Sequence, residues 1–370
     1  MNIENLVPKN IQSLQPYEAG KTIEEVQKLY QPKKISKLAS NENRLGCSEK
    51  VHQAIIKASG DIHDYPDPLA SDLRQKLADL HQVSESEILL GAGSESIIGM
   101  LCRTFFKDDE NAVTANGTFV GFFVQSGVRG IQVKRVPLTK DYQFDVKGIL
   151  ETVDGKTKMI YIANPNNPTG TYITKKEYKI LLDGIPENIL LVIDEAYHEY
   201  ARSVKDYPNT LLSRHKNVVT LRTFSKAYGL AGMRVGYAIA AEELIEQMIK
   251  TKLTFEPTRL GQAAAKASMD DQSFVEKSVK AVIKEREKLY DFFDEHDVRY
   301  VRSIANSVMM ILEDEYAARS FTEKMMKQGV IVRRTHAFKL PNCIRITIGT
   351  EEEMNHFKES YSKLLEMSEF

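Results

Sequence analysis

The sequence predicts an α/β protein with two parts: a large domain with a mostly parallel sheet flanked by helices, and a smaller α+β domain. Its 370 residues exceed one ordinary domain. Between about residues 91 and 240 short apolar runs alternate with amphipathic stretches, and after about residue 270 this alternation stops. We therefore expect an N-terminal arm over 1–40, a large domain over 41–270, and a linking helix with the small domain over 271–370. The arm is expected to pack with the small domain or across a dimer.

Short apolar runs supply the strands of the large domain. Because they lack polar alternation, they are typical of strands that are covered on both faces. The candidates are residues 88–91, 112–115, 159–163, 189–194, 218–221 and 235–239. Between two of them, Thr174 and Glu177 have the spacing of a capping box that starts a helix. In such a fold, ligands bind beyond the carboxyl ends of the strands.

The C-terminal part follows a different pattern. An apolar stripe at helical spacing predicts one long linking helix, and it consists of Val275, Val279, Val282, Leu289 and Phe293. Strands are expected near residues 307–312, 330–332 and 343–347. Thr350 and Glu353 form a second capping box, which opens the terminal helix. One further helix is expected in the arm, after Thr22.

The amino-acid composition limits which kinds of ligand or binding partner the protein is expected to have. The 50 basic and 51 acidic residues nearly cancel and form no basic block, which argues against a nucleic-acid partner. Cys47, Cys102 and Cys343 are widely spaced and the histidines lack a metal-ligand spacing, so neither disulfides nor a metal is expected. The N-terminus is not leader-like, and no apolar window reaches about 18 residues. We therefore expect a cytoplasmic protein that binds a small molecule and no membrane.

A glycine-rich turn at residues 91–96 joins a predicted strand to a predicted helix. Glycines allow the tight turn, and the amides at the start of the helix can bind a phosphate. The spacing is not that of a dinucleotide-binding motif, because Ile97 and Ile98 follow where a third glycine would be needed. On this motif alone, a plain connecting turn is an equally good interpretation.

A second motif, Asn-Pro-Asn-Asn-Pro-Thr-Gly at residues 164–170, follows a strongly apolar strand. Two prolines and a glycine predict a rigid loop at the carboxyl end of that strand. Asparagine side chains there can donate to a ligand oxygen without adding charge. A loop that only connects two elements has less reason to contain two Asn-Pro pairs, so we favour a functional interpretation.

Two charged residues end the next strands. Asp194 terminates an apolar run, and a buried carboxylate needs a cation or hydrogen-bond donors; a protonated ring nitrogen is one such partner. Lys226 lies on a small-residue loop, where burial can make its amine nucleophilic, and Ser225 and Arg234 flank it as potential phosphate ligands. Taken alone, the aspartate is a helix cap and the lysine a surface charge. Together with the two loops, they match the phosphate, phenolic oxygen, ring nitrogen and aldehyde of pyridoxal phosphate.

At this point the chain resembles the fold-type-I pyridoxal-phosphate-dependent aminotransferases. The resemblance rests above all on the motifs at 164–170, 194–197 and 223–226, and it extends from residue 37 to residue 350. Within that family the chain looks like the enzymes that act on histidinol phosphate. Ser96 departs from the pattern because an acidic residue is common there, and Arg44 and Asn116-Gly117 stand where prolines are frequent.

The resemblance implies a role for each matched residue. Lys226 would carry the cofactor as a Schiff base, Asp194 would pair with its ring nitrogen, and Phe119 would stack on the ring. Asn167 and Tyr197 would bind the phenolic oxygen. The residues implied for the phosphate are Ala92, Gly93, Ser94, Ser225 and Arg234, with Tyr65 from the other subunit of a homodimer that shares its active sites. The residues implied for the substrate are Tyr17, Asn43, Arg333 and Arg345.

The implied reaction is a ping-pong transamination, in which L-histidinol phosphate and 2-oxoglutarate give imidazole acetol phosphate and L-glutamate in histidine biosynthesis. Four other functions stay open. The same fold carries aromatic amino acid aminotransferases and decarboxylases of phosphorylated amino acids. A non-catalytic cofactor-binding protein is a more distant alternative, although no helix-turn-helix segment precedes the matched region. An NAD-dependent oxidoreductase has only the glycine turn in its favour.

Overall fold

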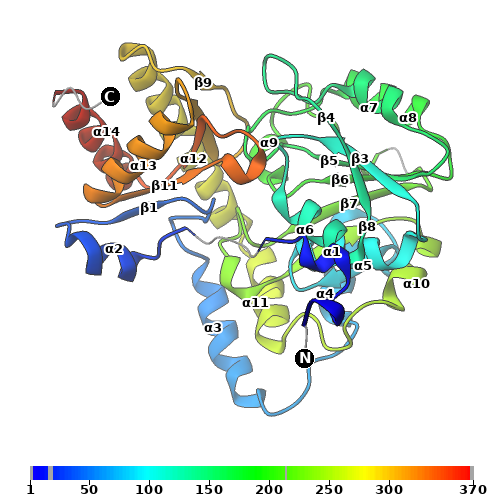
Figure 1. The fold of residues 1–370 in the computed structure, drawn as a ribbon. Helices are drawn as coiled ribbons and strands as arrows, with labels where there is room; N and C mark the ends of the chain where they lie inside the picture. Colours follow the sequence, from blue (N-terminus) through cyan, green and yellow to red (C-terminus); the bar gives the residue numbers. More distant parts are fainter. Residues whose placement is uncertain (1–2, 16–19, 213–214, 367–370) are drawn as a thin grey trace.

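The computed structural model describes residues 3–15, 20–212 and 215–366, which form a large and a small domain (Figure 1). The large domain contains a seven-stranded sheet. Its strands, in spatial order, are β2 (Ile88–Gly91), β8 (Gly236–Ile239), β7 (Val218–Thr223), β6 (Leu190–Asp194), β5 (Thr157–Ala163), β3 (Asn111–Ala115) and β4 (Gln132–Val136). β8 runs antiparallel to both of its neighbours, while the pairs from β7 to β4 are parallel. The expected mostly parallel sheet is confirmed.

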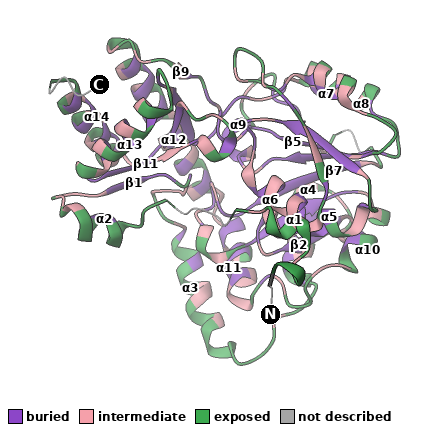
Figure 2. Ribbon diagram, viewed as in Figure 1, coloured by how far each residue is buried: buried purple, intermediate pink, exposed green. Residues whose placement is uncertain are grey.

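Each face of this sheet has its own apolar core, because successive side chains of a strand point to opposite faces. In β5, Met159 and Tyr161 pack on one face and Ile160 and Ile162 on the other. The first face is covered by α5 (Ser94–Phe105), α6 (Val120–Arg129) and α10 (Glu242–Ile249), and the second by α7 (Val146–Thr152) and α8 (Lys175–Gly184). Figure 2 shows the strands buried between these helices. The capping box is present at the start of α8, where Thr174 accepts from the Glu177 amide at 3.2 Å.

The small domain is built on a five-stranded sheet. Its strands, in order, are β1 (Ser36–Leu38), β11 (Val330–Arg334), β12 (Cys343–Thr347), β10 (Ser307–Ile311) and β9 (Tyr300–Val301). Its helices are α13 (Glu315–Lys327) and α14 (Glu351–Glu366), and the latter begins with the predicted Thr350–Glu353 capping box. The predicted linking helix is α12 (Gln272–Glu295), and four residues of its stripe are buried: Val275, Val282, Leu289 and Phe293.

The N-terminal arm touches both domains of its own chain. Helix α1 (Lys9–Gln12) lies on α6, where the Asn10 amide donates to the carbonyl oxygens of Gly127 and Val128 at 3.1 Å. Helix α2 (Ile23–Tyr30), the one predicted after Thr22, packs beside α13, and β1 extends the small sheet. The arm therefore contributes a strand to the small sheet, and its first helix lies on α6 of the large domain.

The remaining elements connect these layers. The helices are α3 (Glu49–Ala58), α4 (Ser71–His81), α9 (His198–Ala201) and α11 (Arg259–Met269), and the 3₁₀ turns are η1 (Ile3–Asn5), η2 (Ser59–Asp61), η3 (Glu85–Glu87), η4 (Ala231–Met233) and η5 (His336–Phe338). Over the described ranges, none of the helices combines the length and apolarity needed to cross a bilayer.

Candidate active site

Three of the predicted motifs meet where neighbouring strands end. β5, β6 and β7 are parallel neighbours, so the loop after β5, Asp194 at the end of β6 and Lys226 just after β7 come to one edge of the sheet. The loop between β2 and α5 reaches the same place. Two adjoining cavities lie there, an inner one of about 100 Å³ and an outer one of about 840 Å³. Both are lined by Glu95, Phe119, Asn167, Tyr197 and Lys226.

Asp194 lies at the floor of the inner cavity and is 3% exposed. Its Oδ2 accepts from the Tyr161 hydroxyl at 2.7 Å, and its Oδ1 accepts from the Ala196 amide at 3.2 Å. Burial raises the pKa of Asp194 to about 6, against the lowering effect of these two hydrogen bonds. Such a carboxylate favours a cationic partner, because a nearby positive charge would lower its pKa and keep it ionised.

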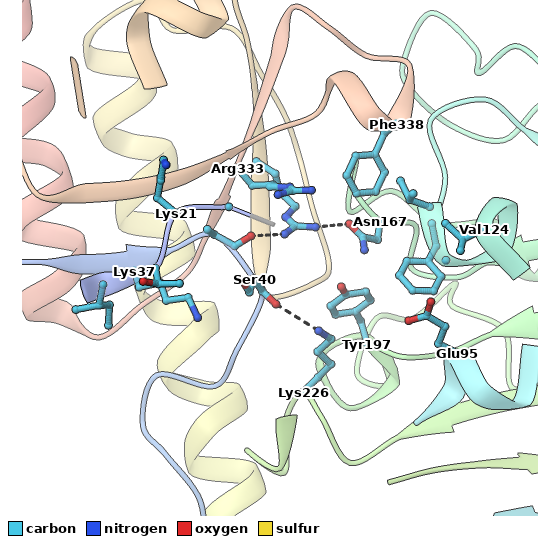
Figure 3. Close-up of a pocket in the computed structure, with 18 of the residues that line it drawn as sticks. Lys21, Lys37, Ser40, Glu95, Val124, Asn167, Tyr197, Lys226, Arg333 and Phe338 are labelled. Atoms are coloured by element: carbon cyan, nitrogen blue, oxygen red, sulfur yellow. Dashed lines mark hydrogen bonds between the residues drawn. The ribbon is translucent and has the colours of Figure 1, made fainter. Parts of the chain in front are cut away.

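Lys226 lines both cavities, and its Nζ donates to the Ser40 carbonyl oxygen at 3.4 Å (Figure 3). Burial lowers the pKa of Lys226 to about 8, and the guanidinium groups of Arg345 and Arg234 act in the same direction. A sizeable fraction of this amine is therefore neutral near neutral pH and can act as a nucleophile or a base.

Asn167 and Tyr197 line both cavities and lie on the same side of Lys226, with Tyr197 nearer to the lysine (Figure 3). The Asn167 carbonyl oxygen accepts from Arg345 Nη1 at 2.6 Å, which leaves its amide nitrogen to donate into the cavity. The Tyr197 hydroxyl accepts from the Asn41 amide at 2.9 Å and keeps its own proton to donate. The two side chains can therefore hold one anionic oxygen between them.

Ser94, Ser225 and Arg234 form an anion cradle on the wall of the inner cavity. Arg234 Nη1 lies 3.4 Å from Ser225 Oγ, and Ser94 begins the twelve-residue helix α5. Glycine is required beside them: a Cβ on Gly93 would lie 2.7 Å from Arg234 Nη2, and one on Gly236 would lie 2.4 Å from the Ser94 nitrogen. A guanidinium, two hydroxyls and a helix N-terminus in one place are suited to a phosphate group.

Ala92 does not line either cavity, although we expected it at the phosphate. Its amide donates instead to Ser96 Oγ and to Glu256 Oε2, both at 3.2 Å. The Ala92 hydrogen-bond donor is engaged by the protein itself, and its role at a phosphate stays a prediction.

The outer cavity is cationic on the small-domain side. Arg333 and Arg345 are register partners on adjacent strands, and both line the cavity together with Lys21, Lys37 and Phe338. Arg345 is 5% exposed and also donates to the Ala39 carbonyl oxygen. Phe119 also lines this cavity, and its ring can stack on a flat aromatic ligand. Two guanidinium groups on one wall are suited to a substrate with a phosphate or carboxylate end.

Two expected site residues lie outside both cavities. Asn43 lines neither cavity, and its amide donates to the Ala227 oxygen and to Ser278 Oγ, both at 2.9 Å. Its role toward the substrate stays a prediction. Tyr65 is 74% exposed and lies outside the cavities of its own chain. Tyr17 lies outside the described residues.

Several residues of the site escaped prediction. Tyr161 holds Asp194, Asn41 holds Tyr197, and Glu95 adds a carboxylate to both cavities. A signal existed for Tyr161, because a tyrosine hydroxyl inside an apolar strand needs a hydrogen-bond partner. Asn41 and Glu95 belong to segments whose relation to the site depends on tertiary structure.

Comparison with known proteins adds independent information. The family model described as aminotransferase class I and II matches residues 33–360. The histidinol-phosphate aminotransferases of Bacillus velezensis and Bacillus subtilis strain 168 are each 40% identical to this chain, over 94% of it and 96% of the relative.

Solved structures agree with these matches. The histidinol-phosphate aminotransferase of Sinorhizobium meliloti in complex with pyridoxal-5'-phosphate is 28% identical, with a TM-score of 0.89 and 98% of both chains covered. A single mutant of the Thermus thermophilus aspartate aminotransferase shares the fold, with 22% identity, a TM-score of 0.85 and coverage of 97% of this chain and 99% of that one.

Proposed function

Because the chain belongs to the aminotransferase class I and II family, we propose that it uses pyridoxal phosphate to transaminate L-histidinol phosphate with 2-oxoglutarate. The products are imidazole acetol phosphate and L-glutamate, a step of histidine biosynthesis. The observation that carries the proposal is the meeting of Lys226, Asp194 and the anion cradle in one cavity that opens toward Arg333 and Arg345. The names of the relatives support the substrate.

The residues of the inner cavity fit each functional group of the cofactor. Ser94, Ser225 and Arg234 would hold its phosphate, and glycines at positions 93 and 236 keep open the space that a Cβ would fill. Asp194 would bind the ring nitrogen, and Asn167 and Tyr197 the phenolic oxygen. Phe119 would cover the ring. When bound, pyridoxal phosphate supplies an electron sink for the bond-breaking at the substrate's Cα.

Lys226 acts as the nucleophile that holds the cofactor and then as the base. When it is not bound to the cofactor, its Nζ would be the base that accepts a proton from the substrate's Cα and gives it back. A pKa near 8 is suited to both directions of this transfer at neutral pH. Asp194 would hold the ring nitrogen in its protonated form through an ion pair, and Tyr161 fixes the orientation of that carboxylate.

Arg333 and Arg345 bind the anionic end of the substrate. Histidinol phosphate offers a phosphate and 2-oxoglutarate offers carboxylates, so the same guanidinium groups serve both half-reactions. The bond from Arg345 to Asn167 places the anion site beside the residue that binds the phenolic oxygen. Substrate and cofactor are therefore oriented by one connected set of side chains.

A homodimer with shared active sites belongs to the proposal. Tyr65 lines neither cavity of its own chain and stacks on Phe255, with the ring centroids 4.1 Å apart. The neighbouring apolar side chains of Ile62, Leu253 and Phe255 are 66%, 65% and 41% exposed. An exposed apolar surface of this kind is typical of a subunit interface. Tyr65 would then donate to the cofactor phosphate of the partner subunit.

The proposed substrate is tested by comparing amino donors in a glutamate-formation assay. We expect a far higher kcat/KM with L-histidinol phosphate than with L-phenylalanine or L-tyrosine. Preference for an aromatic amino acid would keep the cofactor chemistry and reject the substrate.

A further inference from the structure

Glu256 reaches from outside the cavities to the loop that forms the anion cradle. Its Oε2 accepts from Ser96 Oγ at 2.6 Å and from the Ala92 amide at 3.2 Å. The same Ala92 amide also approaches Ser96 Oγ at 3.2 Å, so the three groups form one closed hydrogen-bonded triangle. Ser94 follows Ala92 by two residues. It is the first residue of α5 and belongs to the anion cradle.

The segment that carries Glu256 is itself firmly held. Lys252 Nζ donates to the Glu256 carbonyl oxygen at 2.5 Å and to the Pro68 carbonyl oxygen at 2.8 Å. The neighbouring Phe255 stacks on Tyr65. Glu256 is therefore a fixed acceptor rather than a side chain that samples solvent.

The loop it contacts turns at two glycines, the first of which ends β2 opposite Gly236. Gly91 and Gly93 flank Ala92, and Gly93 has φ +82, a conformation that costs glycine little. A flexible loop binds an anion well only if its donors are held in the binding geometry beforehand. The hydrogen-bonded triangle fixes the backbone of Ala92, which lies between the two glycines, and so holds the loop in one geometry.

We propose that Glu256 is a positioning residue for the anion cradle, which holds the 91–94 loop so that Ser94 faces Ser225 and Arg234 before the cofactor phosphate arrives. The inference rests on the proposed function, because that phosphate is the one of pyridoxal phosphate. It also assigns the Ala92 amide to Glu256 and removes it from the ligands of the phosphate.

The charge of Glu256 opposes this role, because a carboxylate near a phosphate repels it. Two variants separate the effects. Glu256→Gln keeps an oxygen that can accept from Ala92 and Ser96 and removes the charge, whereas Glu256→Ala removes both. Positioning therefore predicts that glutamine preserves cofactor binding and that alanine does not.

The experiment measures the dissociation constant of pyridoxal phosphate for the full-length apo-protein by fluorescence titration. We expect the dissociation constant of Glu256→Gln to stay within about threefold of the parent value. Glu256→Ala should bind pyridoxal phosphate on the order of tenfold more weakly, because it leaves the Ala92 amide without that acceptor. Ser96→Ala should raise the dissociation constant less, because the Ala92 amide can still donate to the Glu256 carboxylate. In the double variant the two losses should not add, because both act through one triangle.

Glu243→Ala provides the matched control, because Glu243 is an exposed glutamate of α10. It should leave the dissociation constant unchanged. A second readout separates positioning from a general loss of stability: the ³¹P signal of the bound cofactor should move in Glu256→Ala and stay in place in Glu256→Gln.

Two results would overturn the inference. Tighter binding by Glu256→Ala would show that the carboxylate competes with the phosphate for Ala92. Parent-like affinity and an unchanged ³¹P signal in Glu256→Ala would show that the contact is incidental. Both leave the proposed function intact, whereas a parent protein that does not bind pyridoxal phosphate would reject the proposed function itself.

Discussion

Arg345 Nη1 lies 2.6 Å from Oδ1 of Asn167, so a strand of the small domain is bonded directly to the loop after β5 of the large domain. Because the same guanidinium also donates to the Ala39 oxygen, the cation is fixed from two sides at the boundary between the cavities. Asn167 lines both cavities and Arg345 lines the outer one. In the proposed function, the substrate anion and the phenolic oxygen of the cofactor would therefore be bound by two side chains that are bonded to each other.

Arg345→Lys should lower kcat/KM on the order of 100-fold, because lysine keeps the charge but loses the planar set of donors that binds an anion and Asn167 together. Steady-state kinetics with L-histidinol phosphate checks this. The matched control is Arg334→Lys on the neighbouring strand, where the guanidinium pairs with Glu315. This substitution should leave kcat/KM within about twofold of the parent value. Equal effects of the two substitutions would argue against a specific role for Arg345.

The pH dependence of cofactor capture follows from the lowered pKa of Lys226. Only the neutral amine attacks an aldehyde, and the lysine is protonated below its pKa of about 8. The capture rate of the apo-protein should therefore rise about tenfold per pH unit below 8 and level off above it. Borohydride trapping at a series of pH values measures this rate. A profile that keeps rising toward about pH 10, the range of an ordinary lysine, would contradict the depressed pKa.

Tyr161→Phe tests the support beneath Asp194. The Tyr161 hydroxyl lowers the pKa of Asp194, so its removal should raise that pKa further and weaken the ion pair with the ring nitrogen. We expect kcat to fall about tenfold and the unfolding free energy to fall by about 1 kcal/mol. Asp194→Asn should lose on the order of 1,000-fold in kcat, as it abolishes the charge. A Tyr161→Phe enzyme with parent-like kcat would remove Tyr161 from the site.

Tyr65→Phe should weaken pyridoxal phosphate binding about fivefold, because the proposed dimer loses one hydroxyl donor to the phosphate in each site. Tyr316→Phe is the control, since Tyr316 is 78% exposed on α13. Equilibrium titration of the apo-proteins measures both.

Shared sites can be tested independently with mixed dimers. When Lys226→Ala and Tyr65→Phe subunits are exchanged, each mixed dimer contains one site with an intact lysine and an intact tyrosine. Activity should then exceed the sum of the two parent variants. Strict additivity after proven subunit exchange would place Tyr65 outside the partner's site.

Most of the large sheet could be predicted from the sequence because its central strands are covered on both faces. The short strands β1, β4 and β9 were not predicted. β4, for example, is an edge strand whose residues are mostly only partly buried, so it lacks the continuous apolar run that marked the others.

The residues of the candidate site also fall into those that the sequence could predict and those that it could not. Asp194 and Lys226 follow predicted strands, and the structure brings them to one cavity. Ala92 and Asn43 were assigned by resemblance, yet their hydrogen bonds go to Glu256, Ala227 and Ser278, which are distant in sequence. Those partnerships arise from tertiary packing, and no local pattern in the sequence signals them.

The most direct test of the proposed function is a single half-reaction. Purified protein loaded with pyridoxal phosphate is mixed with L-histidinol phosphate in the absence of 2-oxoglutarate, and the keto product is counted per site, with Lys226→Ala as the control. We predict one imidazole acetol phosphate per site in the parent and none from Lys226→Ala on the same timescale. No product from a cofactor-loaded parent, or equal product from the Lys226→Ala variant, would contradict the account.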